Sequence, residues 1–217
     1  MIKYAIFDLD GTLLDTIKTI TYYVNLVLRR ENIPEISEEE CKYFVGNGAK
    51  ALIKRALESR GISDSAVLFR VYEEYNREYN LDTLYLTEPY EEIRELLRSL
   101  KERGIELAVL SNKPDFATKS IISAFFPGAF SVVHGGRDGI PLKPEPNGVF
   151  EICKELSADI LEAIYVGDTN VDMQTGKRAG AKKTVGVSWG FRSREELLEY
   201  GADIIVDRPL EILNCLD

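Results

Sequence analysis

The fold is decided by one stretch of the chain, residues 3–15, which reads KYAIFDLDGTLLD. Its first half is a short apolar run of the kind that forms a strand buried on both faces, and the run ends abruptly in two acids followed by glycine. A buried carboxylate without a partner costs several kcal/mol, on the order of other unpaired buried polar groups. We therefore expect a positive group beside Asp8 and Asp10 where this strand ends.

Two simpler interpretations of these acids must be weighed. Asp-Gly is among the commonest turn dipeptides, so Asp10-Gly11 taken alone predicts a turn as readily as a functional site. A calcium-binding loop would need an acid or Asn at position 12 and Glu at position 19, where this chain has Thr12 and Thr19. The remaining segments of the chain decide whether the acids form a site.

The composition limits the classes of partner. With 217 residues, of which 45% are hydrophobic and 29% charged, the chain can form one good core and a smaller module. A net charge of -9 argues against nucleic acid or an anionic membrane as partner, since both require a basic face. It permits a phosphorylated small molecule, because one nearby cation outweighs distant, screened charges.

Three features of the sequence bear on where the protein is located. No apolar run approaches the ~20 residues that cross a bilayer, and the first residues lack a basic stretch followed by an apolar core. The three cysteines are odd in number and form no C-x-x-C pair, which is typical of a reducing compartment. We expect a cytoplasmic protein with no membrane partner.

Residues 15–81 carry helical patterns and no convincing strand. After Asp15 and Thr16, which we expect to cap the first helix, apolar residues recur on one helical face. Ser37-Glu38-Glu39-Glu40 is a capping box that opens a second helix. Two further helices are expected over residues 49–60 and 63–80. We therefore predict an all-helical domain at 15–81, inserted into a core formed by 1–14 and 82–217.

From Pro89 onward helix and strand patterns alternate, which predicts a parallel sheet covered by helices on both faces. In such sheets the ligand site lies beyond the carboxyl ends of the strands, where the strand order reverses. Several of the predicted strands end at polar residues. The predicted strands after the first cover residues 106–111, 130–134, 163–168, 184–187 and 202–207.

Those strand ends carry four short motifs. They are Asp8-x-Asp10-Gly-Thr, Ser111-Asn112-Lys113, Lys143 between two prolines, and Gly167-Asp168-x-x-x-Asp172. In this order and context they resemble the haloacid dehalogenase superfamily, and specifically its phosphatases. The helical insertion, its turn at residues 46–48 and the segment 186–191 look most like the phosphoglycolate phosphatase branch.

The resemblance implies an α/β fold, a doubly wound Rossmannoid parallel sheet with an inserted helical cap. It also implies a catalytic set. Asp8 would be the nucleophile that forms an aspartyl phosphate, and Asp10 would protonate the leaving oxygen and then activate water. Lys143 would neutralise the phosphoryl group and fix Asp8, while Ser111 would hold a phosphate oxygen.

The number of negative charges expected at this site predicts a bound metal ion. Asp8, Asp168 and Asp172 together with a phosphate dianion would repel one another strongly without a cation. Oxygen ligands and the absence of a His or Cys cluster favour Mg²⁺. We assign Asp8, the backbone carbonyl of Asp10 and Asp168 as ligands. Asp172 either joins them, directly or through water, or holds Lys143.

The remaining substrate contacts are expected from both domains. The resemblance assigns Gly11, Thr12 and the backbone N–H of Asn112 to the phosphate, and Asn47 with Gly48 to a specificity loop in the cap. Residues 46–51 also fit a dinucleotide fingerprint superficially, but they follow an acidic helix rather than a strand. For Lys113 two roles stay open, a surface lysine or a contact to a substrate carboxylate.

The predicted function is magnesium-dependent hydrolysis of small phosphate monoesters, most like that of a phosphoglycolate phosphatase. The expected partner is a small phosphorylated metabolite, and the chain is expected to be a monomer or weak homodimer. Three alternatives stay open: an inorganic pyrophosphatase, a phosphosugar mutase, and a non-enzymatic binding module with a vestigial site.

Overall fold

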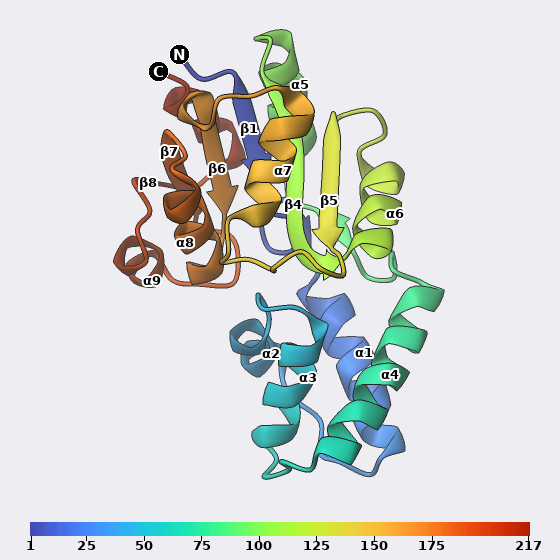
Figure 1. Ribbon diagram of the computed structural model, residues 1–217. Helices are drawn as coiled ribbons and strands as arrows, with labels where there is room; N and C mark the ends of the chain where they lie inside the picture. Colours follow the sequence, from blue (N-terminus) through green and yellow to red (C-terminus); the bar gives the residue numbers. More distant parts are fainter. The chain divides into compact units, whose positions relative to one another are not determined.

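A computed structural model describes residues 1–217 (Figure 1). The chain divides into two compact units, one made of Met1–Asp15 with Pro89–Asp217 and the other of Thr16–Glu88. The second boundary lies at Glu88 rather than at the expected residue 81. The segment after the last helix of the smaller unit is tied to that unit, since Tyr23 Oη donates to the Asp82 carbonyl at 2.9 Å.

The larger unit is built on a six-stranded parallel sheet with the order β5-β4-β1-β6-β7-β8. The central strand β1 lies within the apolar run that predicted a buried strand. From β1 the strands extend to β5 on one side and to β8 on the other, so the strand order reverses beside β1. The strands are β1 (Tyr4–Phe7), β4 (Glu106–Pro114), β5 (Val132–Gly136), β6 (Ala163–Gly167), β7 (Lys183–Val187) and β8 (Ile204–Val206).

Helices cover both faces of this sheet, as the doubly wound prediction requires. Alternate residues of β1 enter different clusters: Phe7 packs with side chains of α5 (Ile93–Glu102) and α6 (Asp115–Phe125), whereas Ile6 packs with side chains of α7 (Asn147–Leu156). The other helical elements of this unit are η1 (Ile160–Glu162), α8 (Asn170–Ala179), α9 (Arg194–Glu199) and η2 (Pro209–Cys215).

The register of the sheet brings three strand ends to one place. Phe7, the last residue of β1, pairs with Val109 of β4 and with Val166 of β6. The polar residues that follow these positions in each strand therefore meet at one edge. Between Leu110 and Pro114 the pairing of β4 with β5 shifts register, an irregularity that re-aims side chains.

The smaller unit contains four helices, α1 (Ile17–Arg30), α2 (Glu38–Phe44), α3 (Ala49–Glu58) and α4 (Ser65–Leu81). The capping box predicted for α2 is present, with Ser37 and Glu40 each bonding the other's backbone N–H. The expected cap of α1 is wrong in one respect, because Thr16 occupies the N-cap without a side-chain hydrogen bond. Tyrosines of α1 and α4 pack together, with ring centroids of Tyr23 and Tyr79 5.3 Å apart.

Two short strands were not predicted, β2 (Leu14–Asp15) and β3 (Glu88–Pro89). At two residues each they are too short for an alternating pattern to reveal them. Across the whole chain, none of the helices combines the length and the apolar character that a bilayer-spanning helix needs.

Candidate active site

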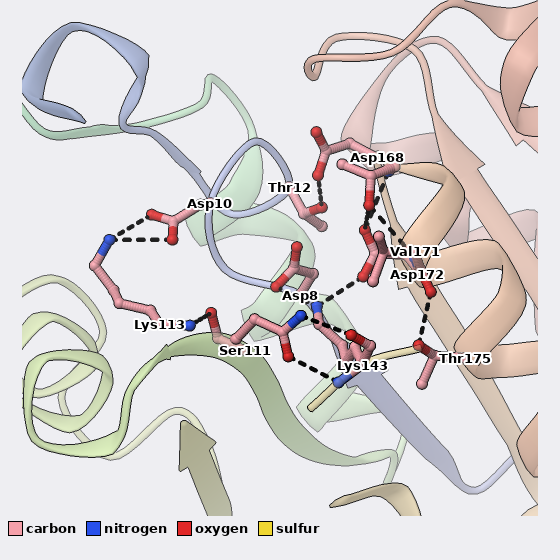
Figure 2. A network of polar contacts seen from close by, with 12 residues as sticks. Asp8, Asp10, Thr12, Ser111, Lys113, Lys143, Asp168, Val171, Asp172 and Thr175 are labelled. Atoms are coloured by element: carbon pink, nitrogen blue, oxygen red, sulfur yellow. Dashed lines mark hydrogen bonds and ion pairs between the residues drawn. The ribbon is translucent and has the colours of Figure 1, made fainter. Parts of the chain in front are cut away.

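The four motifs predicted from the sequence come together at the carboxyl edge of the sheet in the larger unit (Figure 2). Asp8 follows β1, Ser111 lies in the last part of β4, and Asp168 follows β6. Asp172 lies in the first turn of α8, and Lys143 lies in the segment that precedes α7. The segments are far apart in sequence, so the sheet topology is what assembles them.

Lys143 is the cation that the acids of the first strand were expected to need. Its Nζ lies 2.7 Å from Oδ1 of Asp8 and 2.7 Å from Oδ1 of Asp172. The lysine side chain is only 3% exposed. Ion pairs withdrawn from water in this way are costly to form, which is typical of a functional arrangement rather than of a stabilising one.

The backbone of Lys143 is fixed by the side chain of Asn112. The Asn112 Nδ2 donates to the Lys143 carbonyl at 2.9 Å, and the Lys143 N–H donates to Asn112 Oδ1 at 2.8 Å. A pair of reciprocal bonds defines both the position and the orientation of the loop. The sequence analysis assigned only the backbone N–H of Asn112, and no local pattern indicated this contact across 31 residues.

Burial and like charge shape the electrostatics of the cluster. The pKa of Asp8 is raised well above its ordinary value by burial and by the charge of Asp172, which Lys143 offsets only in part. Burial acts to lower the pKa of Lys143, but Asp172 and Asp8 outweigh it, so the ammonium stays charged. The cluster as a whole therefore contains more carboxyl groups than cationic groups, and burial disfavours ionisation of Asp8.

Asp168 is completely buried and held by two donors. Thr12 Oγ1 donates to Oδ1 at 2.9 Å, and the backbone N–H of Phe191 donates to Oδ2 at 2.9 Å. Burial, followed by the charge of Asp172, raises the pKa of Asp168 to about 7. The Thr12 hydroxyl, which the sequence analysis assigned to substrate, is thus engaged by the protein.

Two glycines make room for the Asp168 carboxyl group. A Cβ at Gly11, where φ is +84°, or at Gly190 would collide with the Asp168 side chain. Gly11 also needs its positive φ, which other residues rarely adopt. The sequence analysis assigned Gly11 to substrate and gave Gly190 no individual role, because nothing local indicates that residues 11 and 190 flank the same carboxylate.

Asp172 is oriented by the start of its own helix. Thr169 is the N-cap of α8, its hydroxyl donates to Asp172 Oδ2 at 2.6 Å, and its backbone N–H donates to the same atom at 3.1 Å. The Asp-x-x-x-Asp spacing therefore places Asp172 at the third helical position of a capping box. Tyr165 Oη donates to Oδ1 at 3.4 Å from the buried strand β6.

The donor set of this cluster fits a divalent cation. One carboxylate oxygen each from Asp8, Asp168 and Asp172 lie within 4.8 Å of one another, and all three residues are buried. Three carboxylates face a single ammonium group, and hard oxygen donors of this kind prefer Mg²⁺ or a similar ion. Burial, followed by the charge of Asp172, raises the pKa values of Asp8 and Asp168, and a bound cation would act in the opposite direction.

A second ion pair lies on the other side of Asp8. Lys113 Nζ is 3.0 Å from Oδ1 and 3.1 Å from Oδ2 of Asp10. The Lys113 side chain is 6% exposed and that of Asp10 is 18% exposed. Lys113 is therefore not a surface lysine, and it provides a positive group beside Asp10 of the kind expected for the acids at the end of the first strand.

With this geometry in place, the chain can be compared with known proteins. The family model for haloacid dehalogenase-like hydrolases matches residues 5–187, which include all four motifs. The chain belongs to the haloacid dehalogenase-like hydrolases. Both the predicted family and the predicted α/β fold are thereby confirmed.

Relatives of this hydrolase cover nearly its whole length. A phosphoglycolate phosphatase from Aquifex aeolicus is 30% identical over 99% of this chain and 97% of its own. An N-acetylmuramic acid 6-phosphate phosphatase from Pseudomonas aeruginosa is also 30% identical, over 100% of this chain and 95% of its own. A crystal structure assigned as a phosphoglycolate phosphatase from Lactobacillus delbrueckii subsp. bulgaricus has a TM-score of 0.94 at 30% identity, covering 99% and 98% of the two chains.

These likenesses confirm a phosphatase of this family that is phosphoglycolate phosphatase-like in sequence. The roles assigned to individual residues in this hydrolase stay predictions. Ser111 is buried, and its Oγ accepts from the Lys113 N–H at 3.2 Å. Asn47 and Gly48 lie in the smaller unit between α2 and α3, where Arg55 donates to Asn47 Oδ1 at 2.7 Å.

Proposed function

We propose that this hydrolase cleaves small-molecule phosphate monoesters through an aspartyl phosphate on Asp8, with Mg²⁺ as cofactor. The observation that carries the proposal is the Asp8 carboxylate at the end of β1, contacted by Lys143 at 2.7 Å and grouped with Asp168 and Asp172. The groups that phosphoryl transfer needs therefore lie together. They are a buried nucleophile, a cation for the phosphoryl oxygens and an acidic cluster.

In the first half of the reaction, an Asp8 carboxylate oxygen attacks phosphorus as the bond to the leaving oxygen breaks. Asp10 transfers its proton to that oxygen, so the alcohol leaves neutral. Lys143 stays beside Asp8 and stabilises charge on the transferring group. The Ser111 hydroxyl and the Asn112 backbone N–H hold phosphate oxygens.

In the second half, Asp10 takes a proton from water, and the water oxygen attacks phosphorus. The bond between phosphorus and Asp8 breaks, which regenerates the carboxylate and releases inorganic phosphate. The same residue thus acts as acid and then as base, and proton and charge balance over the cycle.

Asp8, Asp168 and the backbone carbonyl of Asp10 would hold Mg²⁺, with Asp172 either a further ligand or the anchor of Lys143. The contact between Asp172 and Lys143 at 2.7 Å favours the anchor role. When bound, the ion would neutralise the negative charge of the carboxylates and the phosphate. Thr12 and Thr169 keep Asp168 and Asp172 oriented for this purpose.

For the substrate, we propose a small phosphorylated acid of the phosphoglycolate type. The named substrates of the Aquifex and Pseudomonas relatives are both phosphorylated acids, and both relatives are 30% identical to this chain. We also propose that the helical unit acts as a cap domain in which Asn47 and Gly48 contribute to specificity. We further propose a cytoplasmic monomer or weak homodimer, and the net charge of -9 argues against nucleic acid or an anionic membrane as partner.

A phosphate-release screen tests the proposal. It should include phosphoglycolate, N-acetylmuramic acid 6-phosphate, hexose phosphates and pyrophosphate. We expect release of phosphate from monoesters, and loss of at least about 10⁴-fold in kcat for Asp8→Asn, because the nucleophile is removed. The variant should fold, since a neutral isostere relieves the charge that burial disfavours at this position.

The alternatives give different outcomes in the same screen. Hydrolysis of pyrophosphate alone would indicate a pyrophosphatase, and an isomeric phosphosugar without free phosphate would indicate a mutase. No turnover of any ester, with Mg²⁺ present, would leave a binding module. Comparable activity of Asp8→Asn and wild type would exclude the covalent mechanism.

A further inference from the structure

We propose that Lys113 is a specificity residue that binds a carboxylate on the leaving group of the substrate. The inference rests on the proposed function and narrows it. The preferred substrates would be phosphate monoesters of short hydroxy acids, in which the carboxylate lies one carbon from the ester oxygen.

The Lys113 side chain is buried beside Asp10. The side chain is 6% exposed, and its Nζ lies 3.0 and 3.1 Å from the two oxygens of Asp10. A lysine withdrawn from water at a functional edge is uncommon unless it has an anionic partner. Asp10 supplies that partner in the substrate-free protein, which fixes the ammonium group next to the proposed acid.

Lys113 lies on the same side of Asp8 as the proposed acid, Asp10. Figure 2 shows Asp10 and Lys113 on one side of Asp8, with Asp168 and Asp172 on the other. In an in-line displacement, the attacking and leaving oxygens lie on opposite sides of phosphorus. Because Asp10 serves the leaving oxygen, the leaving group lies towards Lys113 and away from the carboxylate cluster.

The two lysines of the site contact different carboxyl groups. Lys143 already contacts two carboxylates, those of Asp8 and Asp172, and serves the transferring group. Lys113 contacts the carboxyl group that gives up its proton during transfer. A carboxylate on the leaving group would lie next to the Lys113 ammonium as a further counter-charge, in a part of the site where water is largely excluded.

The geometry also sets the length of the leaving group. An ester oxygen that contacts Asp10 lies close to an ammonium group that is itself about 3 Å from Asp10. A carboxylate attached to the adjacent carbon reaches both groups at once. A longer spacer would have to fold back, so short 2-hydroxy acids fit this side of the site best.

The test compares two substrates that differ in this group alone, phosphoglycolate and 2-hydroxyethyl phosphate. We expect wild type to prefer phosphoglycolate by at least about 30-fold in kcat/KM. In Lys113→Met both rates should fall, since Asp10 loses its partner, but the preference should shrink to about threefold or less. The loss of preference should appear mainly in the KM for phosphoglycolate. Lys119→Met, at an exposed lysine of α6, serves as the control and should keep the preference.

Two outcomes would overturn the inference while the proposed function stands. One is equal hydrolysis of both esters by wild type, a result that needs no variant and so does not depend on whether Lys113→Met folds. The other is an equal fall for both esters in Lys113→Met, which would make Lys113 a positioning residue for Asp10. If wild type cleaves no phosphate ester in the screen, the proposed function fails and the inference falls with it.

Discussion

The ion pairs of the active site in the larger unit and those of the helical unit lie in opposite environments. In the larger unit, Lys143 lies 2.7 Å from Asp8 and Asp172, and all three side chains are at most 10% exposed. In the helical unit, pairs of similar length join exposed side chains, such as Arg70 with Glu31 at 2.7 Å, where the arginine is 55% exposed. Ion pairs with the same distance between nitrogen and oxygen can therefore contribute very differently to the free energy of unfolding.

The difference follows from the solvent around each pair. An exposed pair stays hydrated and contributes about 0–1 kcal/mol, whereas a buried pair must first lose its water. Burial, followed by the charge of Asp172, raises the pKa of Asp8 and brings that of Asp168 to about 7. In the exposed pair, the hydrogen bond from Arg70 lowers the pKa of Glu31. The buried cluster thus holds its charges at a cost in free energy, whereas the pair in the helical unit links the end of α1 to α4 at little cost.

The largest expected effect comes from breaking the buried pair. Lys143→Met leaves Asp8 and Asp172 without their shared cation, which should reduce kcat/KM at least about 10³-fold and destabilise the fold by about 3 kcal/mol. Steady-state kinetics and urea unfolding measure the two effects. Retention of more than a tenth of wild-type kcat/KM would show that Lys143 does not serve the transferring phosphoryl group.

Removal of divalent ions should come next in size. In excess chelator, phosphate release should fall at least about 100-fold, and Mg²⁺ should restore it because the carboxylate cluster then gains its missing charge. Mg²⁺ should also raise the melting temperature, since it binds the folded state. The matched control is Asp168→Asn, which should lose this rise; full activity in chelator would contradict the charge argument.

The third effect is a pH dependence of stability in the metal-free protein. Asp168 has a pKa of about 7 in the folded chain against an ordinary value of 3.8, so between these values the folded state binds more protons than the unfolded state. The free energy of unfolding therefore falls as the pH rises through this window.

The matched comparison is Asp168→Asn, which cannot titrate at this position. Because wild type loses stability as the pH rises, the free energy of unfolding of the variant relative to wild type should increase by on the order of 1–3 kcal/mol from pH 5 to pH 8. Urea unfolding in chelator measures this difference. If the difference in free energy of unfolding between variant and wild type stayed constant with pH, the pKa of Asp168 would not be raised in the folded chain.

The smallest effect is expected in the helical unit. Arg70→Ala removes an exposed pair with Glu31, so the melting temperature should change by less than about 3 °C and kcat should stay the same. A larger shift in melting temperature would show that the exposed pair of Arg70 and Glu31 contributes more to stability than its exposure predicts.

The sequence was sufficient where the signal is local. The apolar run before Asp8, the alternation of helices and strands, and the capping box at Ser37 each follow from residues close in the chain. The candidate site was also predictable, because parallel strands end at the same edge and so collect Asp8, Ser111 and Asp168.

The parts that could not be predicted depend on contacts between distant segments. Nothing near Asn112 indicates that its amide holds the backbone of Lys143, and nothing near Phe191 indicates that its N–H bonds Asp168. The last three residues of β4 were not assigned to the strand, because the register shift there depends on β5. The burial of Lys113 likewise appears only once Asp10 is placed beside it.

Gly190 shows how a residue with no reactive atom can be required by a reactive site. The volume that its side chain would fill already belongs to the Asp168 carboxyl group. Even a methyl group at this position would push the acid off its two donors. A search for this kind of site that scores acids and lysines alone would overlook such a position, although the absence of a side chain there is as specific a requirement as the presence of a carboxylate at 168.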